Sequence, residues 1–274
     1  MNHTKKKSKK QGKNQLPLFL LSAGAVLVLL LMILLLGGRA SAPAPGTDST
    51  FPLPEANPYD ADDFSYDGAY LTCRAAGSML GVDVSEHQPS VDWEQVRQSG
   101  VEYAMIRIGY RGYTEGRIFP DASFSEHLTG AREAGLKVGV YFFSQAVTVR
   151  EAQEEAAFLL EHLDGAQLDM PVVFDWEYVS QDARTGNMDG GTLTDCAVAF
   201  CDAVQAAGYR PMVYFNLDIS QNLYDLRALT DYDFWLAMYS DRMDYPYKIK
   251  MWQYTDSGSV PGIDGSVDLN LYLP

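Results

Sequence analysis

Two acidic residues stand two positions apart at the end of an apolar run. Asp175 and Glu177 follow the segment PVVF in the stretch PVVFDWEYV. On a β-strand, residues two apart point to the same side, with their Cβ atoms about 6.5 Å apart. Two carboxyl groups at that distance do not both ionise freely, so one becomes a proton donor while the other stays charged. Cleavage of a glycosidic bond needs this combination of an acid and a nearby negative charge.

Two further carboxylates occupy comparable places in other apolar segments. Asp83 ends the run in GVDVSEHQ, and Asp268 lies in GSVDLNLY. If these segments are strands of one barrel, all four acids meet at its mouth, where barrel enzymes carry their active sites. We therefore predict Asp83, Asp175, Glu177 and Asp268 as catalytic residues. The alternatives are surface acids at strand ends and a Mg²⁺ or Ca²⁺ site; no further ligand spacing supports a metal, so we predict no metal and no cofactor.

Aromatic side chains accompany the acids at the ends of the same segments. Ring faces match the apolar faces of sugars, although most Tyr and Trp residues of a barrel fill its core or rim. His87 follows the first of these segments closely and fits either a polar lining or a loop. We predict that the residues contacting substrate are Tyr110, Tyr141, Tyr214, Trp235, Tyr239, Trp252 and Gln253.

The scaffold for these residues begins at Leu80, where a short apolar run followed by an amphipathic helical stretch starts to repeat. Glycines that follow several of the helical stretches are typical helix C-caps. The predicted strands are Leu80–Val84, Tyr103–Ile108, Lys137–Phe143, Pro171–Trp176, Pro211–Phe215, Phe234–Tyr239, Lys250–Gln253 and Ser266–Leu269. The predicted helices are Trp93–Gln98, Ser123–Glu133, Val149–His162 and Leu193–Ala206, with a short one around Ile219–Leu223.

This alternation of strands and helices predicts an α/β fold. It favours parallel βαβ units, and continuous apolar strands such as MPVVF indicate a sheet that is buried on both faces. Eight strands within residues 80–274 favour a closed barrel of the (β/α)₈, or TIM, type. A doubly wound open sheet is the alternative, but no Gly-rich phosphate loop follows the first strand, which argues against its nucleotide-binding version.

Charge is distributed unevenly along the 274 residues. Residues 1–39 hold seven of the 21 basic residues and no acidic residue, so residues 40–274 carry 14 basic and all 36 acidic residues. Such an acidic body is repelled by phosphate backbones, so we predict no nucleic-acid partner. The three cysteines, Cys73, Cys196 and Cys201, are too few for a disulfide scaffold and fit no zinc spacing.

The N-terminal region predicts attachment to a membrane. Residues 1–15 form a lysine-rich tail, and residues 16–36 are an uncharged apolar run long enough to span a bilayer. The positive-inside rule keeps the tail in the cytoplasm, which makes residues 16–36 a signal anchor and places the body outside the cytoplasm. The alternative is a secreted protein, cleaved near Ala42. Residues 37–79, rich in Pro, Ala and Asp, are interpreted as a linker before the domain at 80–274.

Three motifs, in order, identify a family that this chain resembles. They are GVDVSEHQPSVDW from Gly81, PVVFDWE from Pro171, and FWLAMYS with KMWQYTDSGSVPGIDGSVDLN from Phe234 to Asn270. Over about residues 80–274 the chain resembles glycoside hydrolase family 25, the Chalaropsis-type lysozymes or N-acetylmuramidases. The resemblance implies an irregular (β/α) barrel of the TIM type, with about five βα units followed by three strands.

The same resemblance implies a reaction and residue roles. Members of the family hydrolyse the β-1,4 bond between N-acetylmuramic acid and N-acetylglucosamine in peptidoglycan. Glu177 would be the general acid/base, and Asp175 its partner, orienting the 2-acetamido group or acting as nucleophile. Asp83 and Asp268 would shape the charge of the site. With the anchor, this predicts a membrane-tethered enzyme of wall remodelling. The rival interpretations are a wall-glycan-binding module without catalysis and a chitinase-like glycosidase.

Overall fold

The computed structural model of the chain describes residues 52–274. The predicted cytoplasmic tail, the signal anchor and residues 37–51 of the predicted linker lie outside the described residues. Within residues 52–274, the structure contains no helix with both the length and the apolar character needed to cross a membrane.

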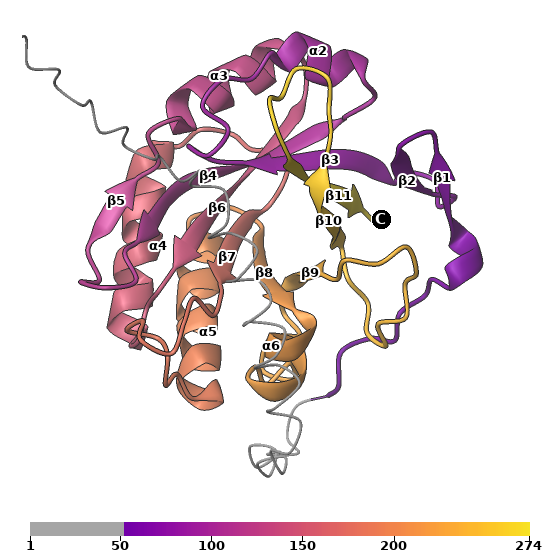
Figure 1. Cartoon of the computed structure of the whole chain (residues 1–274). Helices are drawn as coiled ribbons and strands as arrows, with labels where there is room; N and C mark the ends of the chain where they lie inside the picture. The colour runs from indigo at the N-terminus through magenta and orange to yellow at the C-terminus, as the bar shows by residue number, and fades with distance from the viewer. Residues whose placement is uncertain (1–51) are drawn as a thin grey trace, which may run out of the picture. The chain divides into compact units, whose positions relative to one another are not determined.

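Eight strands close into a barrel (Figure 1). Around the barrel the order is β3, β11, β10, β9, β8, β7, β6 and β4, and pairing of β4 with β3 completes the ring. The open-sheet alternative is therefore wrong, and all eight predicted strands are present. The strands are β3 (Met79–Val84), β4 (Tyr103–Arg111), β6 (Lys137–Ser144), β7 (Val172–Trp176), β8 (Pro211–Asn216), β9 (Asp233–Ala237), β10 (Met251–Gly258) and β11 (Val267–Tyr272). A short strand that was not predicted, β5 (Ile118–Pro120), pairs with the end of β4.

The last strand departs from the predicted parallel arrangement. β11 runs antiparallel to both of its neighbours, β10 and β3, whereas the other pairs within the barrel are parallel. A parallel strand after β10 would require a long crossover, but few residues separate β10 from β11. As a result, the first residues of β11 lie beside the last residues of β3, and Asp268 is in register with Asp83.

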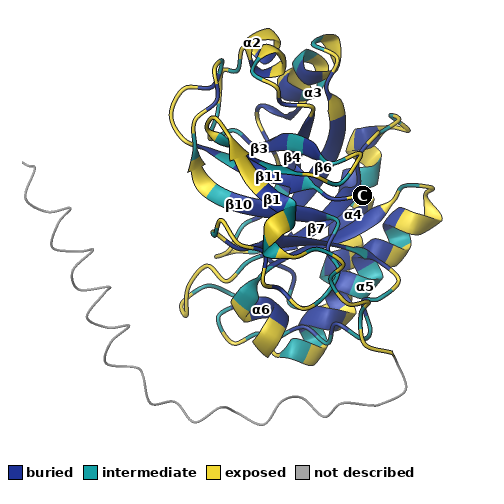
Figure 2. Ribbon diagram, turned by 90° about the vertical axis from the view of Figure 1, so that its right-hand side faces the viewer, coloured by how far each residue is buried: buried dark blue, intermediate teal, exposed yellow. Residues whose placement is uncertain are grey.

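Five helices cover the outside of the barrel (Figure 2). They follow the first five barrel strands, and most begin with an Asp, Asn or Thr side chain that accepts a hydrogen bond from a backbone N–H of the first turn. The helices are α2 (Trp93–Gln98), α3 (Phe124–Glu133), α4 (Val149–Leu163), α5 (Gly190–Ala206) and α6 (Leu217–Asn222). No regular helix is described after β9, so the last three strands follow one another through loops and turns.

Alternation along each strand divides the apolar residues into two cores. Residues of one parity, such as Tyr103, Met105 and Val173, fill the inside of the barrel. Those of the other parity, such as Ala104, Ile106 and Phe174, pack beneath the helices. Polar side chains with inward parity therefore point toward the barrel axis. Near the mouth, this parity directs them into the site.

Residues 52–79 of the predicted linker are part of the folded domain. A 3₁₀ turn (η2, Ala61–Asp63) leads into a hairpin of β1 (Phe64–Asp67) and β2 (Tyr70–Cys73). Leu71 is buried, and the ring of Phe64 packs edge-on against Trp252 with centroids 5.2 Å apart. The backbone of Ala56 bridges to Tyr247. The linker prediction is therefore wrong for residues 52–79, where isolated apolar residues among polar ones gave no periodic pattern.

Removal of this N-terminal segment should destabilise the barrel. A fragment that begins at Ala75 loses the burial of Phe64 and Leu71, each worth about 1.5–3 kcal/mol, and exposes Trp252. We expect it to melt about 10 °C below the fragment 52–274 in thermal denaturation followed by circular dichroism. Phe64→Ala in the longer fragment should reproduce part of the loss. Equal melting temperatures would contradict this role of the segment.

Candidate active site

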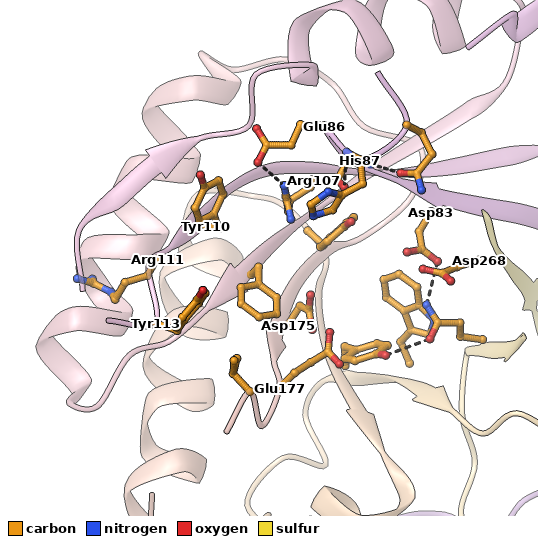
Figure 3. Close-up of a pocket in the computed structure, with 18 of the residues that line it drawn as sticks. Asp83, Glu86, His87, Arg107, Tyr110, Arg111, Tyr113, Asp175, Glu177 and Asp268 are labelled. Carbon is orange, nitrogen blue, oxygen red and sulfur yellow. Dashed lines mark hydrogen bonds and ion pairs between the residues drawn. The ribbon is translucent and has the colours of Figure 1, made fainter. Parts of the chain in front are cut away.

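A cavity of about 560 Å³ opens at the mouth of the barrel, at the carboxyl ends of the parallel strands (Figure 3). All four predicted catalytic carboxylates line it. Asp83 is the penultimate residue of β3, Asp268 is the second residue of β11, Asp175 lies near the end of β7, and Glu177 follows that strand. Figure 3 shows Asp83 and Asp268 side by side, with Asp175 and Glu177 nearer the middle of the cavity.

Asp83 is held by amide donors from the two strands after β9. Asn270 Nδ2 and Gln253 Nε2 both donate to its Oδ2 atom, at 2.7 and 3.0 Å. The carbonyl oxygen of the Gln253 side chain accepts hydrogen bonds from the hydroxyl groups of Tyr214 and Tyr239. The predicted residue Gln253 therefore connects Asp83 to two tyrosines that line the same cavity.

Crowding and burial favour the protonated forms of the four acids. The pKa of Asp268 is raised to about 9 by burial, by the charge of Asp83 and by a hydrogen bond to Asp83. Burial and the charge of Asp83 raise the pKa of Glu177 to about 7. The pKa of Asp175 is also raised, by burial first and then by Glu177 and Asp83. The cluster therefore holds protons at a pH where an exposed carboxyl group has none.

Asp175 and Glu177 differ in their surroundings. Asp175 is buried, and its Oδ1 atom has no hydrogen-bond partner. Glu177 is half-buried at the mouth, and within the described part of the chain no hydrogen bond or ion pair to its carboxyl group occurs. Buried polar atoms are normally paired. An unpaired carboxyl oxygen that lines a cavity is placed to accept a hydrogen bond from a bound molecule.

The predicted aromatic residues fall into three groups. Tyr141, Tyr214 and Trp235 are buried and form the floor of the cavity, with the rings of Tyr141 and Tyr214 edge-on to the indole of Trp235. Tyr110 and Tyr239 lie at the rim, Tyr239 with 57% of its surface exposed. The remaining predicted residue, Trp252, does not line the cavity.

Trp252 is a correction to the predicted substrate-binding set. Its neighbours Met251 and Gln253 point into the barrel, so Trp252 points outward. It is fully buried there against Phe64, and its Nε1 atom donates to the carbonyl oxygen of Met238 at 2.7 Å. The interpretation was wrong because the exact parity of this strand could not be read from its short apolar run.

Two buried polar residues of the site were not predicted. Arg107, on β4, lines the cavity and forms ion pairs with Asp121 and Glu86 at 2.7 and 3.0 Å. Asn270 binds Asp83 and accepts a hydrogen bond from Trp235 Nε1. Arg107 has the inward parity of Tyr103 and Met105 within YAMIRIGY, so a lone charge at an inward position was the signal that could have found it. His87 also lines the cavity mouth.

An eight-stranded barrel with four acidic side chains at its mouth, including a D-x-E pair with raised pKa values, has the arrangement that a glycoside hydrolase requires. The chain belongs to glycosyl hydrolase family 25, whose sequence profile matches residues 82–263. The match includes Asp83, Asp175 and Glu177, whereas Asp268 lies just beyond it.

Relatives and solved structures agree with this assignment. The chain is 30% identical to an autolytic lysozyme of Clostridium acetobutylicum over 193 residues, 70% of this chain and 55% of that protein. It is 29% identical to an N,O-diacetylmuramidase of Arthroderma benhamiae, over 52% of this chain and 60% of that protein. The autolysin LytC of Streptococcus pneumoniae, solved with a synthetic peptidoglycan ligand, superposes with a TM-score of 0.64 at 25% identity; the match covers 73% of this chain and 47% of LytC. The chain thus spans about half the length of two of these proteins.

Proposed function

We propose that this protein hydrolyses the β-1,4 bond between N-acetylmuramic acid and N-acetylglucosamine in peptidoglycan. The observation that carries the proposal is the D-x-E pair, in which Glu177 has a raised pKa and the Oδ1 atom of Asp175 is unpaired in the cavity. The fold supports it: the order of the described elements fits an irregular (β/α) barrel of the TIM type, with five βα units followed by three strands.

Glu177 has the properties of the general acid/base. A carboxyl group with a pKa of about 7 is protonated below neutrality, so it can give its proton to the glycosidic oxygen as the bond breaks. Once ionised, the same group can accept a proton from the water that completes hydrolysis. Its half-buried position at the mouth leaves it accessible to a glycan lying across the cavity.

Asp175 supplies the second carboxyl group. Its unpaired Oδ1 atom is an acceptor for the N–H of a 2-acetamido group, a substituent that both sugars of peptidoglycan carry. In its ionised form it also stabilises the positive charge that develops at the anomeric carbon, whether or not it forms a covalent bond there. Asp83 is held in the same cavity by Gln253 and Asn270, and Asp268, whose pKa is raised to about 9, carries a proton beside it at neutral pH.

Analysis of the new sugar ends tests the bond that is cleaved. Purified peptidoglycan would be digested with residues 52–274, reduced with borohydride and analysed by mass spectrometry. Reduced muramic acid ends that are absent with Glu177→Gln would support the proposal. Reduced glucosamine ends would contradict the bond assignment and leave a glycosidase. Binding to the wall without new ends would contradict catalysis and favour a glycan-binding module.

The pH dependence of the reaction should reflect the acid. Because catalysis needs protonated Glu177, kcat/KM should fall as the pH rises through about 7, about tenfold for each further pH unit. Initial rates on soluble peptidoglycan fragments between pH 5 and 9, at constant ionic strength, measure this limb. Activity that stays level up to pH 8.5 would contradict the assignment of Glu177 as the acid.

We also propose that the enzyme is tethered to the outer side of the cell membrane by residues 16–36, with residues 1–15 in the cytoplasm. The described chain enters the barrel at the end opposite the mouth. The carbonyl oxygen of Glu55 accepts a hydrogen bond from the N–H of Lys248, which lies shortly before the start of β10. Because β10 runs parallel to β9, its start lies at the end of the barrel away from the mouth. A tether at that end would leave the mouth free to face the wall.

Cell fractionation followed by N-terminal sequencing tests the tether. Membrane-bound protein that retains residues 16–36 would support it. Free protein in the medium that starts after Ala42 would contradict it and favour secretion. A muramidase activity found in both cases would leave the proposed reaction unaffected.

A further inference from the structure

The catalytic glutamate stands one residue beyond the regular sheet. The parallel ladder between β6 and β7 pairs Ser144 with Trp176 and then ends, so Gln145 and Glu177 are the next residues on each chain. Since the carboxyl group of Glu177 makes no hydrogen bond within the described residues, its direction depends on its own main chain. What fixes that main chain also fixes the position of the acid.

The side chain of Gln145 continues the ladder by one step. Its Nε2 atom donates to the carbonyl oxygen of Glu177 at 3.0 Å and to that of Ser144 at 2.9 Å. Both of its N–H groups are thus used on the main chains of the two neighbouring strand ends. Gln145 is completely buried, so no water competes for these bonds.

The orientation of this amide is itself determined by a neighbouring hydroxyl group. Thr185 Oγ1 donates to Gln145 Oε1 at 2.7 Å, and Thr185 is only 1% exposed. This bond keeps the amide nitrogen directed toward Glu177, because a flipped amide would place N–H groups against the hydroxyl and an oxygen against a carbonyl oxygen.

An ion pair holds the backbone of Gln145 as well. The guanidinium of Arg184 donates to the carbonyl oxygen of Gln145 and forms two hydrogen bonds with the carboxylate of Glu151, at 2.6 and 2.9 Å. Glu151 belongs to α4, whereas Arg184 and Thr185 belong to the loop between β7 and α5. Gln145 itself lies in the loop between β6 and α4, so the contacts connect α4 and the loops after β6 and β7 to the carbonyl of a single residue, Glu177.

We propose that Gln145 is a positioning residue for the general acid, with its amide oriented by the hydroxyl group of Thr185. The inference rests on the proposed function of Glu177. A general acid must lie within hydrogen-bond distance of the oxygen that it protonates, and a displacement of about 1 Å costs on the order of 10²-fold in rate. Loss of the Gln145 bond frees the main chain at Glu177 and lets the carboxyl group move toward solvent.

Substitution of Gln145 in the full-length chain tests the proposal. Gln145→Met keeps the length of the side chain but cannot donate to Glu177. We expect kcat to fall at least about tenfold, with KM within about twofold of the wild-type value. Because Glu177 would be better solvated, the alkaline limb of the pH profile should move to lower pH. A partial loss of folded protein would instead lower the rate equally at every pH.

A matched control lies in the loop after β7. Gln181 also donates to a main-chain carbonyl oxygen, that of Gly186, but it is exposed and does not contact Glu177. Gln181→Met should retain the wild-type kcat and pH profile. If Gln181→Met lowers kcat as much as Gln145→Met does, the effect is not specific to the Glu177 carbonyl and the proposal is overturned.

Thr185 provides a second pair of variants if Gln145→Met folds poorly. Thr185→Val removes the hydroxyl group at constant shape and should lower kcat several-fold, whereas Thr185→Ser keeps it and should restore the wild-type rate and pH limb. An active wild-type enzyme whose kcat and pH limb are unchanged by Gln145→Met or Thr185→Val would overturn the positioning role alone. A wild-type chain without muramidase activity would contradict the proposed function itself.

Discussion

Replacement of Glu177 by glutamine is expected to lower kcat on peptidoglycan about 10²–10⁴-fold, because the amide has the shape of the acid but cannot donate its proton to the leaving oxygen. Substrate binding should be little affected, since Glu177 makes no hydrogen bond within the described residues that the substitution would break. Steady-state rates on soluble glycan fragments, with binding to insoluble peptidoglycan measured in parallel, separate the two effects.

The loss of activity in Glu177→Gln should not be accompanied by a loss of stability above neutral pH. The pKa of Glu177 is raised from its ordinary value to about 7 in the folded protein, so the folded state binds more protons than the unfolded state between those two values. The wild type therefore loses stability as the pH rises through that range, and a neutral glutamine does not. At pH 8, Glu177→Gln should melt no lower than the wild type.

An exposed glutamate gives the control for this variant. Glu161→Gln, on the solvent side of α4, should alter neither the rate nor the alkaline limb. A Glu177→Gln enzyme that keeps more than a tenth of the wild-type kcat would contradict the role of Glu177. The same conclusion would follow if its alkaline limb remained near pH 7.

Strand periodicity accounts for most of what the sequence predicted correctly. Asp175 and Glu177 stand two positions apart on an extended chain, so they point to the same side although Glu177 lies just beyond β7. The continuous apolar run MPVVF predicts a strand that is buried on both faces. The convergence of Asp83 with Asp175 then follows from closure of the barrel. The order of strands and helices was also predictable, because each apolar run is separated from the next by a helical stretch or, in the last part of the chain, by a loop without a helical pattern.

The features that were missed depend on contacts between distant segments. The N-terminal hairpin is stable because Phe64 and Leu71 pack near Trp252 and Tyr254, about 180 residues later in the chain. The outward direction of Trp252 follows from the register of β10 with β9, in which Gln253 lies beside Ala237. Local patterns give neither of these relationships. The placement of Asp268 next to Asp83 likewise depends on the antiparallel direction of β11.

Asp175→Asn is the second substitution for which we expect a large effect, with kcat lowered about 10²–10³-fold. The amide carries no charge to stabilise the positive anomeric carbon. It also presents an N–H group where substrate requires an acceptor, if its nitrogen takes the place of the unpaired Oδ1 atom. Both proposed contributions of Asp175, to charge and to the acetamido group, are therefore lost in one step.

The pH profile distinguishes Asp175→Asn from a loss of the acid. The charges of Asp175 and Glu177 act on each other, and the charge of Asp83 also raises the pKa of Glu177, so the alkaline limb should persist in Asp175→Asn and in Asp83→Asn but lie at lower pH than in the wild type. Because the two residues of the D-x-E pair act in one transition state, the double variant with Glu177→Gln should be little slower than the worse single variant. Fully multiplicative losses would show that Asp175 and Glu177 contribute independently, and a nearly active Asp175→Asn enzyme would remove Asp175 from the mechanism.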